Sequence, residues 1–360
     1  MSLPTAALGR NGPQVTRLGF GLMGLSMAYG PVPADPERLA LLDRAYELGE
    51  RHWDTADLYG DNEDLLGKWF AANPDKRSDI FLATKFANKM LPDGSITIDS
   101  SPDYTKAACE KSLKRLGLPT IDLFYVHRVD YKTPIEKTMQ ALVELKNEGK
   151  IRYIGLSEVS SSTLRRAHAV HPVTAVQFEY SPFSLEIENE SGTNLLATAR
   201  ELGVAIVAYS PLGRGFFTGA LRSPENFAAD DFRRMLPRFN EENFPKNLKL
   251  VDQMKEIAQK KGVTVGQLTL AWLMALGEDI FPIPGTTRLE RLEENVASTK
   301  VELSEAEVKE IRKLLDVFEE AGTRYPDFLM AFGLGETPAL GEEGKPTPEM
   351  SIRLPGFSDH

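Results

Sequence analysis

The chain has 360 residues, of which 42% are hydrophobic and 26% are charged, and its net charge is -10. This composition is typical of a soluble globular protein, and the length fits one large domain or two ordinary ones. The acidic balance and the absence of a long basic run exclude nucleic acid and anionic membranes from the expected partners.

Cysteine usage and apolar runs give further expectations. Cys109 is the only cysteine, so no internal disulfide can form, and no cluster of cysteine and histidine predicts a metal site. No stretch of about 18 apolar residues predicts a membrane span. The N-terminus has no basic start followed by an apolar run, so we expect no secretory signal and a cytoplasmic location.

The first predicted elements are a hairpin, a strand and a helix. Asn11-Gly12, between two short apolar stretches of residues 6–20, predicts a β-hairpin whose tight turn has positive φ at both central residues. A strand is predicted near Phe20. The apolar periodicity of residues 36–49 predicts the first helix.

The same unit of a strand followed by a helix recurs along the rest of the chain. Short apolar stretches predict strands at residues 52–54, 80–84, 122–126, 153–156, 175–178, 204–208 and 280–283. Amphipathic patterns predict helices at residues 64–70, 105–116, 136–146, 161–169, 194–202, 248–260, 265–275 and 291–298. With the strand near Phe20, eight strands alternate with helices.

Eight such units predict an α/β protein with parallel strands that close into a (β/α)8 TIM barrel. The alternative is an open, doubly wound sheet, because Gly19, Gly21 and Gly24 have the spacing of a dinucleotide-binding turn. That match is weak, since the glycines overlap the strand and no ordinary helix follows at once. We predict a barrel over residues 1–319 and an irregular C-terminal extension over residues 320–360.

Candidate reactive residues follow three neighbouring strands, where (β/α)8 barrels place their chemistry. Asp54 ends one strand and precedes Tyr59, Lys85 ends the next, and His127 ends the one after. A free tyrosine has a pKa of about 10, and a nearby lysine ammonium lowers it. We expect Tyr59 to protonate a carbonyl oxygen, Asp54 to hold Lys85, and His127 to orient the substrate.

Several motifs resemble one known family. Residues 52–60 (HWDTADLYG), 83–86 (ATKF) and 125–128 (YVHR) are similar to the segments that carry the catalytic tetrad of the aldo-keto reductases. The similarity continues through residues 153–157, 176–181, 208–213 and 283–287, in the family's order. It is strongest to a fungal and plant subgroup of NADPH-dependent carbonyl reductases. It implies a barrel enzyme that reduces small aldehydes or ketones.

The resemblance also implies a binding site for NADPH or NADP+. Ser157 and Gln177 would bind the nicotinamide carboxamide, Tyr209 would stack on the ring, and Glu294 with Asn295 would meet the adenine. The residues expected along the pyrophosphate and around the 2′-phosphate are Ser210, Leu212, Gly213, Arg214, Gly215, Pro284, Gly285, Thr286, Thr287, Arg288 and Arg291. Independently of the resemblance, a glycine-containing loop that leads into a helix offers free N–H groups to a phosphate.

Three further expectations concern the surroundings of this site. The segment of residues 213–246 carries several arginines, and we expect it to be a mobile lid over phosphate groups. Met23, Trp53 and Phe86 are predicted to line a large apolar substrate pocket. Glu158 stands where many family members have asparagine, and a carboxylate cannot donate to a carboxamide oxygen.

Two other functions remain open from the sequence. One is a regulatory relative that senses its cofactor, similar to the β subunits of potassium channels. The other is a barrel lyase that forms a Schiff base through Lys85, although an adjacent acid such as Asp54 keeps that lysine protonated. The sequence leaves the oligomeric state and the physiological carbonyl substrate open.

Overall fold

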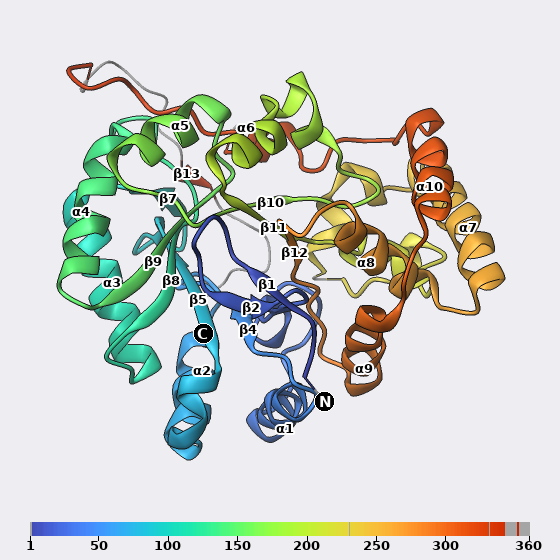
Figure 1. Cartoon of the computed structure of the whole chain (residues 1–360), viewed down its shortest axis with the longest axis horizontal. Helices are drawn as coiled ribbons and strands as arrows, with labels where there is room; N and C mark the ends of the chain where they lie inside the picture. Colours follow the sequence, from blue (N-terminus) through green and yellow to red (C-terminus); the bar gives the residue numbers. More distant parts are fainter. Residues whose placement is uncertain (1, 230, 331, 343–350, 353–360) are drawn as a thin grey trace.

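Eight parallel strands form the centre of the computed structural model, which describes residues 2–229, 231–330, 332–342 and 351–352 (Figure 1). In sheet order the strands are β12 (Ile280–Pro282), β11 (Ala205–Tyr209), β10 (Ala175–Glu179), β9 (Ile151–Ser157), β8 (Ile121–Val126), β5 (Phe81–Phe86), β4 (His52–Asp54) and β3 (Phe20–Gly21). The two edges meet, because the Gly19 amide donates to the Pro282 carbonyl at 3.0 Å and the Gly21 amide to that of Pro284 at 3.2 Å. The predicted (β/α)8 barrel is confirmed, and the open sheet is wrong.

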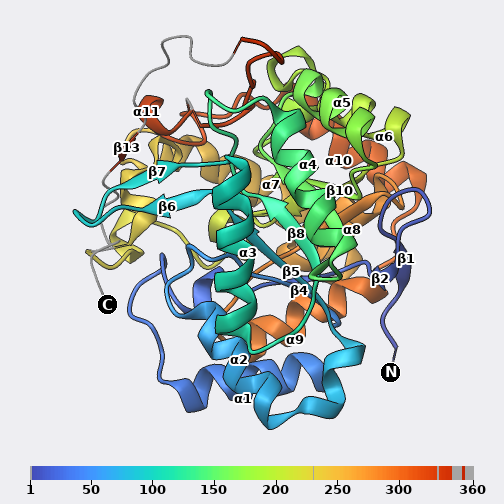
Figure 2. The same cartoon turned by 90° about the vertical axis from the view of Figure 1, so that its left-hand side faces the viewer.

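Helices surround the strands on the outside of the barrel (Figures 1 and 2). They are α1 (Asp35–Glu47), α2 (Asn62–Ala72), α3 (Pro102–Leu116), α4 (Ile135–Asn147), α5 (Ser161–Val170), α6 (Leu195–Leu202), α7 (Phe244–Lys261), α8 (Val265–Ala275), α9 (Leu289–Ala297), α10 (Glu305–Val317) and the short α11 (Asp327–Met330). Local sequence sets their ends. Ser101 caps α3 through its side chain, Pro102 begins the helix, and Gly117 ends it with φ of 63°.

Successive side chains of each strand point alternately out of and into the barrel, so the core has an outer and an inner layer. Outward side chains pack against the helices, while Ala83, Leu123, Tyr125, Val207 and Phe281 form a second cluster inside the barrel. Side chains two residues further along point to the same side. Every second residue therefore points into the barrel, up to the carboxyl end of each strand. The candidate site accordingly lies at the end of the barrel where the strands finish, which is called the mouth.

The N-terminal hairpin closes the other end of the barrel. β1 (Thr5–Ala7) pairs with β2 (Gln14–Thr16) in antiparallel register. The predicted hairpin is present, but the predicted two-residue turn is wrong. Ala7 faces Gln14, so the loop is longer, and Gly9 and Asn11 have positive φ whereas Gly12 does not.

Two parts of the chain hold structure that the sequence analysis did not predict. β6 (Asn88–Met90) and β7 (Ile96–Ile98) form a hairpin after β5, and the C-terminal β13 (Ser351–Ile352) pairs with β7 (Figure 2). The helix α10 was also missed, although Ser304 and Glu307 form a capping box at its start.

The described residues of the segment 213–246, which are 213–229 and 231–246, are folded in the structure. Short 3-10 turns occupy Gly213–Thr218, Pro224–Asn226, Phe232–Met235 and Pro237–Phe239. Its phenylalanines pack together, with ring centroids of Phe216 and Phe239 4.7 Å apart. The arginines expected to face phosphate are already bonded: they pair with carboxylates or with oxygen atoms of the protein, in the contacts Arg214–Glu179, Arg233–Asp231, Arg234–Phe227 and Arg238–Ser184. These contacts oppose the expectation of a loose lid with free arginines.

Candidate active site

A buried ion pair lies at the carboxyl ends of β4 and β5. The Lys85 Nζ atom bonds the Asp54 Oδ1 atom and donates to the Thr55 carbonyl at 2.8 Å. The Gln177 Nε2 atom donates to the other carboxylate oxygen of Asp54 at 2.8 Å. Burial lowers the pKa of Lys85, but Asp54 and Tyr59 outweigh it and raise that pKa above its ordinary value. Lys85 is therefore an ammonium ion at neutral pH.

Tyr59 and His127 lie beside this pair. The Lys85 Nζ atom is 5.0 Å from the ring centroid of Tyr59, whose ring meets that of His127 edge-on with centroids 5.8 Å apart. The sequence analysis expected Lys85 to bring the pKa of Tyr59 below 10. The structure corrects this, because burial raises the pKa of Tyr59 by more than Lys85 lowers it. Tyr59 thus keeps its proton at neutral pH.

His127 is a neutral group that faces this mouth. Burial, Arg128 and Lys85 together lower the pKa of His127 well below 6.5. Its Nδ1 atom is buried and has no hydrogen-bond partner among the described residues. An uncharged imidazole beside a protonated phenol can share a polar ligand atom with it through hydrogen bonds.

Neighbouring strands place the residues expected at the nicotinamide. Ser157 ends β9 and is in register with Gln177 on β10, and Tyr209 ends β11 one strand further. The Ser157 Oγ atom accepts from Arg128 at 3.3 Å. Glu158 follows with φ of 51°, and its Oε1 atom accepts from the Tyr209 hydroxyl at 2.9 Å. The carboxylate at this position therefore already has partners within the protein.

A small cavity of about 50 Å³ lies further along the mouth, between β12, α8 and α9. Most of its lining was predicted as cofactor-binding, namely Leu212, Gly285, Thr286, Arg291, Glu294 and Asn295. Thr218 and Gly266 complete it and carried no signal in the sequence. Gly285 is required for packing, because a Cβ atom there would lie 2.6 Å from the Gly21 carbonyl oxygen.

Other predicted cofactor residues surround this cavity. Ser210, Gly213, Arg214 and Gly215 all have positive φ, so the chain turns sharply after β11. Arg288 precedes α9 with a side chain that is 64% exposed, and Arg291 pairs with Glu294 at 2.5 Å. Thr287 lies in the same loop, between Thr286 and Arg288.

Comparison with known proteins decides the family. The sequence model described as "Aldo/keto reductase family" matches residues 17–316, which is most of the chain.

The chain belongs to the aldo/keto reductase family.

Two fungal aldo-keto reductases are each 51% identical to it over 329 residues. One is from Strobilurus tenacellus and covers 90% of this chain and 95% of its own length. The other is the Schizosaccharomyces pombe enzyme yakc, which is named for NADP(+), with 91% and 95% covered. The chain is thus an oxidoreductase of the family that acts on small carbonyl compounds with nicotinamide cofactors.

Solved structures agree with the fold of this aldo-keto reductase. A glycerol dehydrogenase from Gluconobacter oxydans superposes with a TM-score of 0.78 at 26% identity, covering 89% of this chain and 97% of its own. A thermostable aldo-keto reductase in complex with the inhibitor epalrestat gives a TM-score of 0.68 at 30% identity, with 87% and 100% covered.

Two residues predicted to line the substrate pocket do not reach it. Trp53 precedes Asp54 and Phe86 follows Lys85, so both point away from the barrel interior. Trp53 packs on Trp69 of α2, with ring centroids 4.7 Å apart, and Phe86 is fully buried. The prediction was wrong for both because strand alternation assigns them to the outer layer. Met23 is partly exposed and lies next to Leu22, whose amide bonds the Asp54 carbonyl.

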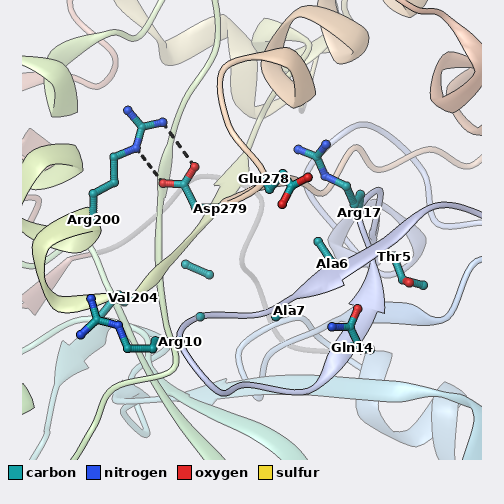
Figure 3. A pocket seen from close by; sticks show the side chains of 13 residues that line it. Thr5, Ala6, Ala7, Arg10, Gln14, Arg17, Arg200, Val204, Glu278 and Asp279 are labelled. Carbon is teal, nitrogen blue, oxygen red and sulfur yellow. Dashed lines mark hydrogen bonds and ion pairs between the residues drawn. The ribbon is translucent and has the colours of Figure 1, made fainter.

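A second cavity of this aldo-keto reductase, larger than the one beside α9, lies away from the mouth. It has a volume of about 500 Å³ and lies under the N-terminal hairpin, at the start of β11 (Figure 3). Arg200 pairs with Asp279 there, and Arg17 donates to the carbonyls of Met274 and Gly277. Ala205 at the start of β11 and Asp279 just before β12 line this cavity, so it lies at the opposite end of the barrel from the candidate active site.

The described residues contain neither a candidate metal site nor a candidate membrane span. In the part of the chain that the structure describes, no group of three or more His, Cys, Asp or Glu side chains could hold a metal ion. None of the described helices has the length and apolar character needed to cross a membrane.

Asp57 gives a prediction on stability against pH. Its Oδ1 atom is buried without a hydrogen-bond partner among the described residues, and burial together with Glu63 raises the pKa of Asp57 to about 8. An unfolded aspartate loses its proton near pH 4. Between about pH 4 and 8 the unfolded chain therefore binds fewer protons, and the free energy of unfolding should fall as pH rises.

Thermal denaturation at pH 5 and pH 8 checks this expectation. We expect Asp57→Asn to reduce the loss of stability at pH 8 by at least about 1.4 kcal/mol, which corresponds to one pKa unit. The exposed Asp103 provides the control variant Asp103→Asn, which should keep the wild-type dependence. The same pH dependence in wild type and Asp57→Asn would refute the assignment.

Proposed function

We propose that this aldo-keto reductase reduces aldehydes or ketones to alcohols with NADPH, and that Tyr59 is the general acid. The observation that carries the proposal is a phenol that keeps its proton beside a buried ammonium–carboxylate pair and a neutral imidazole. Such a group suits proton donation to a carbonyl oxygen in the transition state.

Each residue of the tetrad has a part in the proposed reaction. Bound NADPH supplies the hydride that the carbonyl carbon receives. Tyr59 gives its proton to the carbonyl oxygen, and His127 donates a hydrogen bond that holds this oxygen in place. The Lys85 ammonium stabilises the phenolate that Tyr59 becomes, while Asp54 and the Thr55 carbonyl fix the position of Lys85.

The cofactor would occupy the mouth from Tyr209 to α9. Its nicotinamide end would bind Ser157, Gln177 and the ring of Tyr209, its pyrophosphate would lie along residues 210–215, and its adenosine would meet residues 284–295. One observation supports the fit: a common cavity is lined by the predicted adenosine residues Gly285, Thr286, Arg291, Glu294 and Asn295. The backbone N–H groups before α9 add a favourable site for phosphate.

Lys85 fits this role better than that of a Schiff-base nucleophile. A lysine attacks a carbonyl only as the free amine. Asp54 and Tyr59 raise the pKa of Lys85, so the amine is scarce at neutral pH. Borohydride trapping with candidate carbonyls tests this point, and we expect no covalent adduct at Lys85.

A screen of NADPH oxidation tests the proposed function. The panel should contain medium-chain aldehydes, aromatic aldehydes, ketones and pyridoxal. We expect consumption of NADPH that matches the alcohol formed, for at least one class. Tight NADP(H) binding without turnover of any carbonyl would instead favour the regulatory alternative.

The preference for NADPH over NADH should depend on the arginines before and in α9. The two cofactors differ at the adenosine 2′ position, where NADPH carries a phosphate of charge about −1.5 to −2. Arg288 is exposed there and has only a long contact of 3.8 Å with the exposed Glu290, whereas Arg291 pairs with the less exposed Glu294 at 2.5 Å. Loss of a charge-assisted bond is worth roughly 1.5–3 kcal/mol, so Arg288→Ala should weaken NADPH by about 10- to 100-fold and Arg291→Ala by less.

Fluorescence titrations of both cofactors measure this preference. NADH makes no contact with a 2′-phosphate site, so its affinity should stay within about twofold in both variants. Arg44→Ala serves as the control, because Arg44 is a half-exposed arginine that pairs with Glu293 on the other face of α9. Equal losses for NADPH and NADH would mean that the arginines are structural only.

A further inference from the structure

The C-terminal segment, defined as the described residues 322–330 and 332–338, contributes to the mouth of the barrel. The Gly335 amide donates to the Glu158 carbonyl at 2.7 Å, and Gly335 forms a parallel bridge with Val159 directly after β9. Arg166 on α5 donates to the carbonyls of Thr337 and Pro338, both at a distance of 2.8 Å or less. These bonds attach the segment to the strand end that precedes the proposed nicotinamide site.

The segment also inserts a charged side chain into the site. Both terminal nitrogens of Arg324 bond the Glu158 carboxylate, at 2.9 and 3.1 Å. The two side chains are 3% and 1% exposed, so the pair is almost completely removed from water. The guanidinium also lies 4.8 Å from the ring centroid of Phe178 on β10. A bidentate pair of this kind fixes the orientation of both groups.

The pair of Arg324 and Glu158 is hydrogen-bonded to Tyr209. The Glu158 Oε1 atom that accepts from Arg324 also accepts from the Tyr209 hydroxyl, which lies 3.1 Å from the hydroxyl of Tyr325. The next residue of the same segment thus contacts the same phenol. Three chain segments that are far apart in sequence meet at one tyrosine.

The charge of Glu158 depends on this arrangement. Burial raises the pKa of Glu158, but Arg324 and then Arg128 lower it below its ordinary value, so the group is a carboxylate. The charged or titratable groups that face it are Arg324 and Tyr325 from the C-terminal segment, Arg128 after β8, Glu179 on β10 and Tyr209 on β11. A carboxylate accepts a stronger hydrogen bond from a phenol than a neutral acid does.

We propose that Arg324 is a positioning residue, which holds the ring of Tyr209 in the cofactor site through Glu158. This inference rests on the proposed function, in which Tyr209 stacks on the nicotinamide. It also gives Glu158 a task other than bonding the carboxamide, since both of its carboxylate oxygens are bonded to Arg324. The C-terminal segment is then part of the cofactor site.

Three variants and one control test the proposal. Arg324→Met removes the charge at similar length, Arg324→Lys keeps the charge without the bidentate geometry, and Arg324→Met with Glu158→Gln removes both charges. Arg166→Met is the matched control, because Arg166 binds the same segment but its bonds go to Thr337, Pro338 and Glu136. NADP+ affinity, kcat, KM for the carbonyl and the melting temperature are measured for each.

We expect a graded loss of cofactor affinity in protein that remains folded. Arg324→Met should weaken NADP+ by about 10- to 100-fold, as for the loss of a buried charge-assisted contact. Arg324→Lys should lie between it and wild type. The double variant should recover part of the loss, because Glu158→Gln removes the buried carboxylate that has lost its bonds to Arg324. Arg166→Met should bind NADP+ within about twofold of wild type.

The dependence on pH separates positioning from a purely structural role. In Arg324→Met the Glu158 carboxylate is buried without its main partner, so its pKa should rise toward neutrality. The ratio of the NADP+ dissociation constants of Arg324→Met and wild type should then change between about pH 5 and 8. In the double variant the corresponding ratio should stay constant.

Several results would overturn the proposal. One is a folded Arg324→Met variant with the NADP+ affinity and kcat of wild type. If that variant does not fold, wild-type NADP+ affinity in both Arg324→Lys and the double variant would contradict the proposal equally. Another is an equal loss in Arg166→Met. These outcomes leave a wild type that binds and oxidises NADPH, whereas failure of the wild type itself would contradict the proposed function as well.

Discussion

Replacing Tyr59 by phenylalanine is expected to lower kcat by about 10²- to 10⁴-fold, the usual contribution of general acid catalysis. Only the hydroxyl is lost, and the ring can keep its edge-on contact with His127. The cofactor does not depend on this hydroxyl in the proposed site, so the dissociation constant of NADPH should stay within about threefold. Single-turnover kinetics of NADPH oxidation, together with a fluorescence titration, measure both quantities.

Two controls accompany the Tyr59 variant: substitution of a second tyrosine, and the dependence of the wild-type rate on pH. Tyr104→Phe removes a hydroxyl from α3, outside the tetrad, and should turn over like wild type. Because burial raises the pKa of Tyr59 above 10, the wild-type rate should not fall between pH 7 and about pH 9 through loss of the Tyr59 proton. A Tyr59→Phe enzyme with more than a tenth of wild-type turnover, with chemistry shown to limit the rate, contradicts the assignment.

Removal of Lys85 should have the second large effect, on both rate and stability. Lys85→Met takes away the ammonium that stabilises the tyrosine anion, and kcat should fall by about 10² or more. It also leaves the Asp54 carboxylate buried with Gln177 as its remaining side-chain partner. Breaking a buried ion pair on one side typically costs about 3–5 kcal/mol, so the melting temperature should drop clearly.

A double variant separates these two effects. Lys85→Met with Asp54→Asn removes both charges, so most of the lost stability should return. Turnover should remain low, because no ammonium is present beside Tyr59. Recovery of turnover together with stability would show that Lys85 has only a structural role.

The sequence predicted the cluster of Asp54, Tyr59, Lys85 and His127 because its members are local to strand ends. Asp54, Lys85 and His127 each follow a short apolar strand, and parallel strands bring their carboxyl ends together. The same logic extends to Ser157, Gln177 and Tyr209, which lie in phase with interior residues of β9, β10 and β11. By the same alternation, the residues next to these positions point out of the barrel, as Trp53 and Phe86 do.

Contacts between distant parts of the chain could not be predicted from one sequence. Arg324 and Glu158 are 166 residues apart, and no local pattern marks either as a partner of the other. The pKa of Tyr59 was misjudged for a related reason, since it depends on how deeply the fold buries the ring. By contrast, the capping box of α10 was a local signal that was available and overlooked.

Hydride transfer from the cofactor to a carbonyl carbon is the central claim, and isotope transfer tests it most directly. The enzyme is incubated with NADPH in which both hydrogens at C4 of the nicotinamide are replaced by deuterium and with the best carbonyl of the panel, and the alcohol is analysed by mass spectrometry. We expect one deuterium at the former carbonyl carbon of each product molecule, and about 10²- to 10⁴-fold less labelled alcohol when Tyr59→Phe is assayed over the same time. Alcohol without deuterium, or no alcohol from any carbonyl while NADPH is bound, would contradict the account.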